Sequence, residues 1–171
     1  MLLRDGTEIE DTWVTVADAE MAPVPEGLPD GGVIVPFEVF RELRASRTTN
    51  KHGISITNDI DPAVLEDYLD DISLIAIPYP SFADGRGFSL AKRIKKMGFT
   101  GTLRATGHVI ADQAAFAEAC GFDEIKIDDD VAARQSPGDY ASARQAFPRA
   151  YQTGFSAADQ KTSILEARHG R

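Results

Sequence analysis

Between residues 33 and 127, short apolar runs alternate with segments whose apolar residues recur at helical spacing. Short runs rich in apolar and β-branched residues are typical of strands, and an apolar stripe about every three or four residues is typical of a helix. Strands joined through helices pair in parallel through right-handed crossovers. The sequence therefore predicts an α/β fold with about five mostly parallel strands alternating with helices. The strands are expected at residues 33–36, 54–57, 72–77, 102–106 and 124–127.

Two arrangements of these strands satisfy the pattern. Five β–α units favour a doubly wound open sheet. The alternative is a partial β/α barrel, because a complete eight-stranded barrel typically needs about 250 residues and the chain has 171. In both arrangements we expect the strands at 72–77 and 102–106 to be neighbours, since one crossover helix most economically joins adjacent strands.

The same patterns divide the chain into three parts. Residues 1–32 form an N-terminal lead-in, in which residues 12–16 are a candidate edge strand. Its later prolines cannot belong to a regular central strand, so we expect Trp13 and this acidic region to pack outside the core or against a second subunit, as in a homodimer. Residues 33–155 form the α/β domain, and residues 156–171 form a flexible or helical tail.

Charge and cysteine content exclude several classes of protein. The formal net charge of −9 disfavours binding to nucleic acid or to membrane surfaces. The single cysteine, Cys120, excludes an intrachain disulfide and a four-cysteine metal or iron–sulfur site. No segment approaches the roughly 20 apolar residues that cross a bilayer, and a reducing compartment fits the composition. We therefore expect a cytoplasmic protein that binds neither nucleic acid nor a membrane.

Two strand ends carry the residues that predict a binding site, because ligands of parallel α/β folds lie at the carboxyl ends of strands, beside helix N-termini. The first loop combines glycines, an arginine whose donors suit an oxyanion, and a hydroxyl near a helix start. The second combines an arginine within a strand, a histidine just past it and a polar helix start. The candidate ligand-binding residues are Asp84, Gly85, Arg86, Gly87, Ser89, Arg104, His108, Asp112 and Gln113.

Each of these residues also has a structural interpretation. Asp84 can cap the helix and pair with Arg86 in a tight turn, and Asp112 can cap the next helix. Arg104 lies in a strand that is expected to be covered on both faces, so its charge needs a partner, for which Asp84 and Asp112 are the candidates. His108 is placed for acid–base work or anion contact, against a purely structural role.

Two further features are interpreted as structural. The acids Asp123, Glu124 and those at 128–130 resemble a divalent-metal site, but consecutive acids usually face water and no histidine accompanies them in the sequence. We therefore predict no metal ligands. Cys120 ends a helix, where the negative end of the dipole raises rather than lowers the pKa of a thiol, and it is interpreted as a buried structural cysteine.

Four runs of the sequence resemble an uncharacterised bacterial family of unknown function: FADGRGFSLA (82–91), GTLRATG (101–107), DQ (112–113) and CGFD (120–123). The ending with Phe147, Tyr151 and Gln152 is similar to that family's C-terminal pattern, so the resemblance covers about residues 30–155. Members of the family are often encoded beside assimilatory sulfite reductase and are described as probable oxidoreductases involved in sulfite reduction. The resemblance implies a role in that pathway, with the reductase or its electron donor as partner.

The residues themselves supply no redox machinery for that description. The sequence has no cysteine pair, no complete nucleotide fingerprint and no haem-ligation motif, and electron transfer needs a cofactor or redox-active thiols. The first hypothesis is therefore an accessory protein of assimilatory sulfite and sulfate reduction that binds a small oxyanion. The alternative is an oxidoreductase or another enzyme of sulfite reduction that uses an external cofactor, whose identity stays open.

Overall fold

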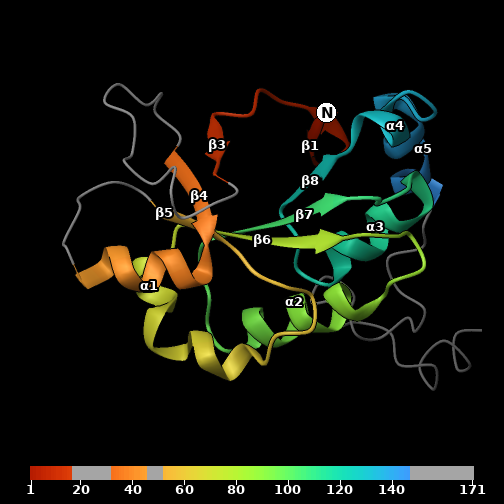
Figure 1. Cartoon of the computed structure of the whole chain (residues 1–171). Coiled ribbons are helices and arrows are strands. Elements are labelled where there is room, and N and C mark those ends of the chain that lie inside the picture. Colours follow the sequence, from red (N-terminus) through yellow and green to blue (C-terminus); the bar gives the residue numbers. More distant parts are fainter. Residues whose placement is uncertain (17–31, 46–51, 147–171) are drawn as a thin grey trace, which may run out of the picture.

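An eight-stranded sheet forms the centre of the molecule in the computed structural model, which describes residues 1–16, 32–45 and 52–146 (Figure 1). Neighbouring strands from β3 to β8 are parallel, whereas β1 is antiparallel to both β8 and β2. The sheet is therefore mixed, and it curls into a half-barrel. From one edge to the other its strands are β2 (Thr7–Glu8), β1 (Leu2–Arg4), β8 (Glu124–Ile127), β7 (Thr102–Gly107), β6 (Leu74–Tyr79), β5 (His52–Ser55), β4 (Gly32–Pro36) and β3 (Trp13–Thr15).

Helices α1, α2 and α3 cover the convex side of this half-barrel. Figure 1 shows them on one side of the central strands β6 and β7, with strands β1 and β3, which belong to the two ends of the curled sheet, on the other. Side chains of the six helices found among the described residues join one apolar core with alternate residues of the strands, such as Ile75 and Ile77. The helices are α1 (Phe37–Ala45), the 3₁₀ helix η2 (Pro62–Asp71), α2 (Arg86–Lys96), α3 (Ala111–Ala119), α4 (Asp129–Ala132) and α5 (Pro137–Ala146).

Local sequence signals set where several of these helices begin and end. Asp61 is the N-cap of η2 and accepts a hydrogen bond from the backbone N–H of Ala63 at 3.2 Å, while Pro62 occupies the first helical position, as expected for both residue types. Gly98 follows α2 with φ +97°, a left-handed conformation that favours glycine. Both boundaries thus follow from local residue types, although the segment after Asp61 is a 3₁₀ helix rather than an α-helix.

The predicted α/β class is confirmed, but the doubly wound open sheet of five strands is wrong. From β3 to β8 the strands follow one another in chain order, whereas a doubly wound sheet reverses its strand order at a switch point. Helices α1, α2 and α3 on one face, together with a curled sheet, match the alternative of a partial β/α barrel better. The additional strands β1 and β2 are only three and two residues long, too short to show a period.

Two predictions about particular strands can be compared with the structure. The strands at 72–77 and 102–106 are confirmed as neighbours, because β6 pairs in parallel with β7. The candidate edge strand at 12–16 is β3, which closes one edge of the sheet. Trp13, expected outside the core, does not join the main apolar core but packs on Ile34 in a small second apolar cluster.

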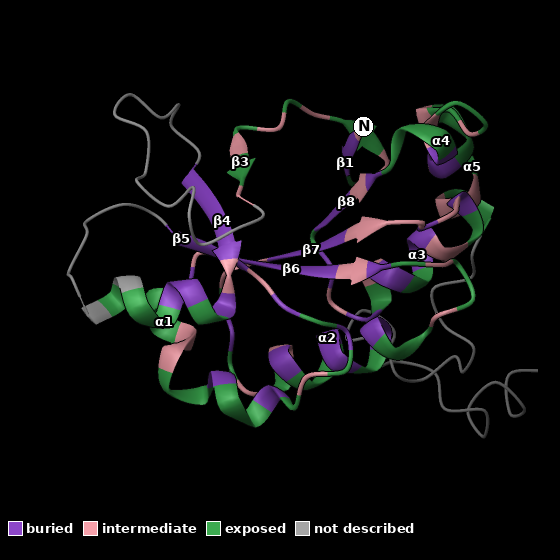
Figure 2. Ribbon diagram, in the orientation of Figure 1, coloured by how far each residue is buried: buried purple, intermediate pink, exposed green. Residues whose placement is uncertain are grey.

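Burial follows this architecture closely. Figure 2 shows that the central strands are buried for most of their length, whereas the helices expose their outer faces. None of the helices described in the structure is long and apolar enough to cross a membrane. The division at residues 32 and 155 stays a prediction, although strands β1 to β3 share the sheet with the later strands. The predicted tail at 156–171 lies outside the described residues.

Candidate functional site

An ion-pair network centred on Arg104 occupies the concave face of the half-barrel. Arg104 is the third residue of β7, and its side chain is 1% exposed. Its Nε donates a hydrogen bond to Oε2 of Glu124 at 2.8 Å, and its Nη2 lies 2.8 Å from the same oxygen in an ion pair. Nη1 donates to Oδ1 of Asp11 at 3.0 Å. Arg104 and Glu124 are register partners on β7 and β8, so their side chains leave the sheet on the same face.

The carboxylate of Asp11 is held by two cations at once. Asp11 lies between β2 and β3, and its Oδ2 accepts a hydrogen bond from Nζ of Lys126 at 2.7 Å. Its Oδ1 accepts a further bond from the backbone N–H of Trp13 at 3.1 Å. Burial raises the pKa of Asp11, but hydrogen bonds from Lys126 and Trp13 and the charge of Arg104 outweigh it, so the pKa lies below its ordinary value.

The predicted partners of Arg104 are wrong. Its partners are Glu124 and Asp11 rather than Asp84 or Asp112. The reason is register: Arg104 lies in the middle of β7, where residues on neighbouring strands are within reach, while Asp84 and Asp112 lie in segments beyond the strand ends. The sequence does contain a signal for Glu124, which opens the next predicted strand, but it contains none for Asp11.

Asp84 and Arg86 form the tight turn that the structural interpretation predicted. Oδ1 of Asp84 accepts bonds from the backbone N–H and from Nε of Arg86, at 3.2 and 3.0 Å, and Oδ2 accepts one from Nη2 at 2.7 Å. Nδ2 of Asn58 also donates to Oδ2, at 2.8 Å. Hydrogen bonds from Arg86 and then from Asn58 hold the pKa of Asp84 well below its usual range. Two nitrogens of Arg86 are thus engaged by this carboxylate.

The other candidate residues of the first loop differ in how far they are buried. Gly87 is buried, and a Cβ there would lie 2.7 Å from the ring of Tyr79, so close packing explains this glycine. Ser89 is exposed on α2, and Gly85 is exposed at its start. Tyr79 is 1% exposed, and burial raises the pKa of its hydroxyl.

Gln113 links the loops that follow β6 and β7. Its Nε2 donates to the carbonyl oxygen of Phe82 at 2.6 Å, and its Oε1 accepts from the backbone N–H of Ile110 at 3.3 Å. Ile110 is the N-cap of α3, so the expected capping role of Asp112 is not observed. Asp112 lies exposed in the first turn of that helix.

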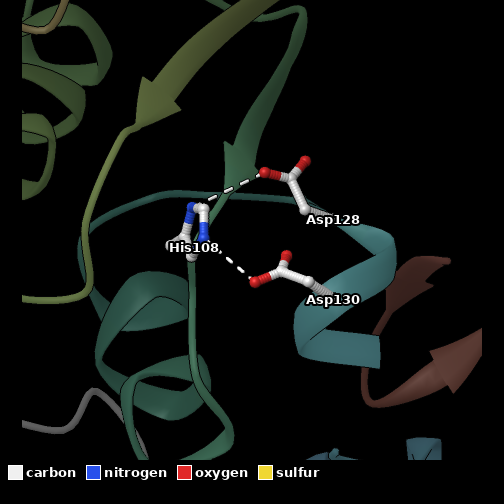
Figure 3. Close-up of side chains that lie close together, drawn as sticks. All are labelled: His108, Asp128 and Asp130. Carbon is white, nitrogen blue, oxygen red and sulfur yellow. Dashed lines mark ion pairs between the residues drawn. The ribbon is translucent and has the colours of Figure 1, made fainter. Parts of the chain in front are cut away.

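His108 lies between two carboxylates at the carboxyl ends of β7 and β8 (Figure 3). Its Nδ1 is 3.6 Å from Oδ2 of Asp128, and its Nε2 is 3.3 Å from Oδ2 of Asp130. The three side chains are 38%, 53% and 58% exposed. A histidine therefore does accompany the acidic cluster, although none stands near it in the sequence. The order of the strands is the signal for this contact, since β7 and β8 are consecutive and parallel.

A cavity of about 290 Å³ adjoins His108 at this end of the sheet. Apolar side chains and the polar groups of His108, Arg134 and Gln135 share its lining. A larger hollow of about 460 Å³ lies at the opposite ends of β6 and β7, where three carboxylates and one guanidinium line it. The apolar lining of the first cavity consists of Phe82, Ile110 and Val131.

Cys120 is 2% exposed, and burial raises the pKa of its thiol. The predicted burial of Cys120 is confirmed, and its structural role stays a prediction. A thiol with a raised pKa is a weak nucleophile and a weak metal ligand at neutral pH, so Cys120 contributes no reactive group to either face of the sheet.

A protein-family model described as a bacterial protein of unknown function, DUF934, matches residues 53–163. The match spans more than half of the chain and includes both loops after β6 and β7 as well as Arg104 and His108. A comparison with curated proteins gives no match.

Proposed function

We propose that this chain, which belongs to the DUF934 family of bacterial proteins of unknown function, is a non-catalytic accessory protein of assimilatory sulfite reduction that binds a small oxyanion in the cytoplasm. The pathway is suggested by the resemblance of residues 82–91 and 101–107 described above. The anion is supported by one observation, the convergence of Arg104 and Lys126 on the carboxylate of Asp11.

The Asp11 carboxylate occupies a position that suits a small oxyanion. Its two oxygens receive a guanidinium, an ammonium and a backbone N–H, at 3.0, 2.7 and 3.1 Å. A guanidinium and an ammonium are the groups that proteins most often use to bind oxyanions. Sulfite, sulfate and phosphate each present at least two oxygens with similar spacing and charge. An oxyanion that displaces Asp11 finds the same three donors.

Charge and access favour such an exchange. With Asp11 in place, two acids, Asp11 and Glu124, are paired with three cations: Arg4, Arg104 and Lys126. When the Asp11 carboxylate moves away, the three cations are left with Glu124 as their one acidic partner in this network. The Asp11 and Lys126 side chains are 20% and 40% exposed, so solvent reaches the hydrogen-bond donors around Asp11. Asp11 lies in a segment between strands, so its side chain can turn away without loss of a strand pair.

The proposed site keeps Arg104 from the predicted residues and adds Lys126, Asp11 and Glu124. Arg86 is a weaker candidate for the anion, because Asp84 already engages its Nε and Nη2. An anion at that turn has to compete with a carboxylate fixed two residues away. The glycines and Ser89 of the same loop accordingly have no part in this proposal.

Calorimetric titration of the full chain with sulfite, sulfate and phosphate tests the proposal. Asp11→Asn removes the competing charge, so we expect tighter anion binding than in the wild type. Lys126→Met removes a charge-assisted hydrogen bond worth about 1.5–3 kcal/mol, so we expect roughly tenfold or weaker binding. Lys96→Met, which changes an exposed lysine on α2, is the matched control. Absence of binding in both the wild type and Asp11→Asn contradicts the proposal.

The partner in this proposal is sulfite reductase or its electron donor. Pull-down of purified reductase by the full chain, with and without sulfite, tests this separately from anion binding. We expect capture of the reductase to survive Lys96→Met. A chain that binds the anion but captures neither protein retains the binding function and loses the accessory role. A second copy of this chain as partner stays a prediction that the molecular mass in solution can test.

The cavity beside His108 favours the alternative function, an oxidoreductase with an external cofactor. Its volume of about 290 Å³ and its lining by Phe82, Ile110 and Val131 suit part of a planar ring system, since cofactor sites are concave and largely apolar. The absorbance spectrum of the purified protein reveals a bound flavin, and fluorescence titration detects a nicotinamide. Phe82→Ala should weaken either interaction, and binding that this substitution leaves unchanged contradicts the use of this cavity.

A further inference from the structure

We propose a separate site for a divalent transition-metal ion, formed by His108, Asp128 and Asp130 at the carboxyl ends of β7 and β8 (Figure 3). One ligand atom from each side chain lies within 4.8 Å of the other two. This inference is independent of the proposed oxyanion site, which lies on the concave face and shares no residue with it.

The three proposed ligand residues lie in different segments, and the fold positions each segment independently. His108 follows β7, and its backbone N–H donates to the carbonyl oxygen of Tyr79 at 2.8 Å. Gly107 precedes it with φ +104°, and a Cβ there would lie 2.6 Å from the same Tyr79 oxygen. A glycine is therefore required for the close approach that places His108. Asp128 directly follows β8, and Asp130 lies in the first turn of α4.

The charges around these ligands leave room for a cation. Arg134 pairs with Asp130, with 3.2 Å between Nη2 and Oδ2. Within the described residues, Asp128 and Asp130 have no other ion-pair partner apart from His108. Two carboxylates thus share one permanent cation. A divalent ion at this position neutralises the excess negative charge that the two acids place beside the imidazole.

The present distances require only small side-chain rotations. The nitrogen–oxygen separations of 3.6 and 3.3 Å approach the spacing of ligands that bind one ion at about 2.0–2.2 Å. One imidazole nitrogen binds the ion, so one carboxylate has to turn toward that nitrogen. All three side chains are at least 38% exposed, which permits this rotation and leaves positions for water. His108 also lines the cavity of about 290 Å³, so a small ligand can approach the bound ion.

The ligand chemistry selects the class of ion. One imidazole with two carboxylates suits zinc, manganese, iron(II) and cobalt, whereas magnesium and calcium favour oxygen ligands alone. A site that depends on the imidazole therefore discriminates between these two groups of ions. A mere acidic surface binds all of them weakly and is indifferent to His108.

Titration of the untagged full chain with Zn²⁺ and Mn²⁺, followed by calorimetry, tests the inference. We expect a saturable one-to-one isotherm for Zn²⁺ and at least a roughly tenfold weaker affinity in His108→Ala and in Asp128→Asn/Asp130→Asn. Asp112→Asn, which changes an exposed acid outside the cluster, should bind as the wild type does. Zn²⁺ should raise the melting temperature of the wild type and of Asp112→Asn, and it should not raise that of the other variants.

Two results overturn the site. One is a wild-type chain that binds neither Zn²⁺ nor Mn²⁺ in a saturable manner. The other is a His108→Ala variant that binds Zn²⁺ as tightly as the wild type does, because the acids then act as a charged surface without the imidazole. Melts in the absence of metal verify that each variant is folded. Sulfite titration of the same variants should be unchanged, which separates this site from the proposed oxyanion site.

Discussion

Arg104 and Arg86 make the same kind of contact in two different surroundings. Each arginine directs Nε and Nη2 at one carboxylate, that of Glu124 for Arg104 and that of Asp84 for Arg86. The side chain of Arg104 is 1% exposed and that of Arg86 is 58% exposed. The acids bound to Arg104 lie 20 and 93 residues away, whereas Asp84 is two residues from Arg86. The network around Arg104 therefore joins segments that are distant in sequence, whereas the Asp84–Arg86 turn is a contact between near neighbours in the chain.

This difference determines what each ion pair contributes. A buried charge that loses its partner is strongly destabilising, because water cannot replace the lost interaction. An exposed pair is screened by solvent and typically contributes about 0–1 kcal/mol. The concave network also ties the N-terminal segment, through Asp11, to strands β7 and β8. We therefore expect substitutions there to affect global stability, and substitutions of the charges in the turn to have small effects.

Arg104→Met should have the largest effect. It leaves the buried carboxylate of Glu124 with Arg4 alone, and loss of one member of a buried pair costs about 3–5 kcal/mol. Arg104→Met/Glu124→Leu removes both charges, and we expect its free energy of unfolding to lie close to that of the wild type. Urea denaturation measures both variants. If the double variant is as unstable as the single one, the network has a role beyond charge compensation.

Gly87→Ala should come next, and it tests packing rather than charge at the turn. The added Cβ would lie 2.7 Å from the buried ring of Tyr79, which also packs against Phe88. Overpacking of this kind costs about 1–3 kcal/mol. Gly85→Ala is the control, because its nearest neighbour would be a ring carbon of Phe88 at 4.0 Å. Equal thermal melts for the two variants contradict the close packing of α2 on β6.

Asp11→Asn should have a smaller effect that depends on pH. The folded-state pKa of Asp11 lies below the ordinary value of 3.8. The charge therefore stabilises the fold above that value, and this contribution is lost as the pH falls through the lower folded-state pKa. The difference in unfolding free energy between wild type and Asp11→Asn should be present at pH 7 and shrink below about pH 4. A difference that grows on acidification contradicts the ion pairs of Asp11.

The two regions also differ in how far the sequence predicts them. The turn was predictable, because Asp84, Gly85 and Arg86 interact over two residues and capping rules describe such contacts. The pairing of β6 with β7 was predictable for the same reason, since one short helix joins them. Signals of this kind act over short stretches of chain and do not depend on the shape of the sheet.

The contact of Arg104 with Asp11 was not predictable in the same way, and the contacts of His108 were missed. Asp11 reaches Arg104 only because β1, β2 and β3 bring the N-terminal segment to both edges of a curled sheet. Of these strands, β1 and β2 are only three and two residues long, too short for a periodic signal. His108 meets Asp128 and Asp130 because β7 and β8 are neighbours, a pairing favoured by the single helix between them, as for β6 and β7. The contact with Asp11 depends instead on the curvature of the sheet, which no local pattern encodes.

Arg86→Met should have the smallest effect, and its size tests the contrast directly. The exposed pair with Asp84 should contribute little even at low salt, because solvent screens it. That contribution should fall as the ionic strength rises, because the screening length shortens from about 10 Å at 0.1 M salt to about 3 Å at 1 M. Asp84→Ala should cost more, since it also removes the acceptor for the backbone N–H of Arg86 and for Asn58, which is 8% exposed. Urea denaturation of both variants at the two salt concentrations measures these differences. A salt-independent loss of several kcal/mol in Arg86→Met means that the turn is coupled to the buried core in the same way as Arg104.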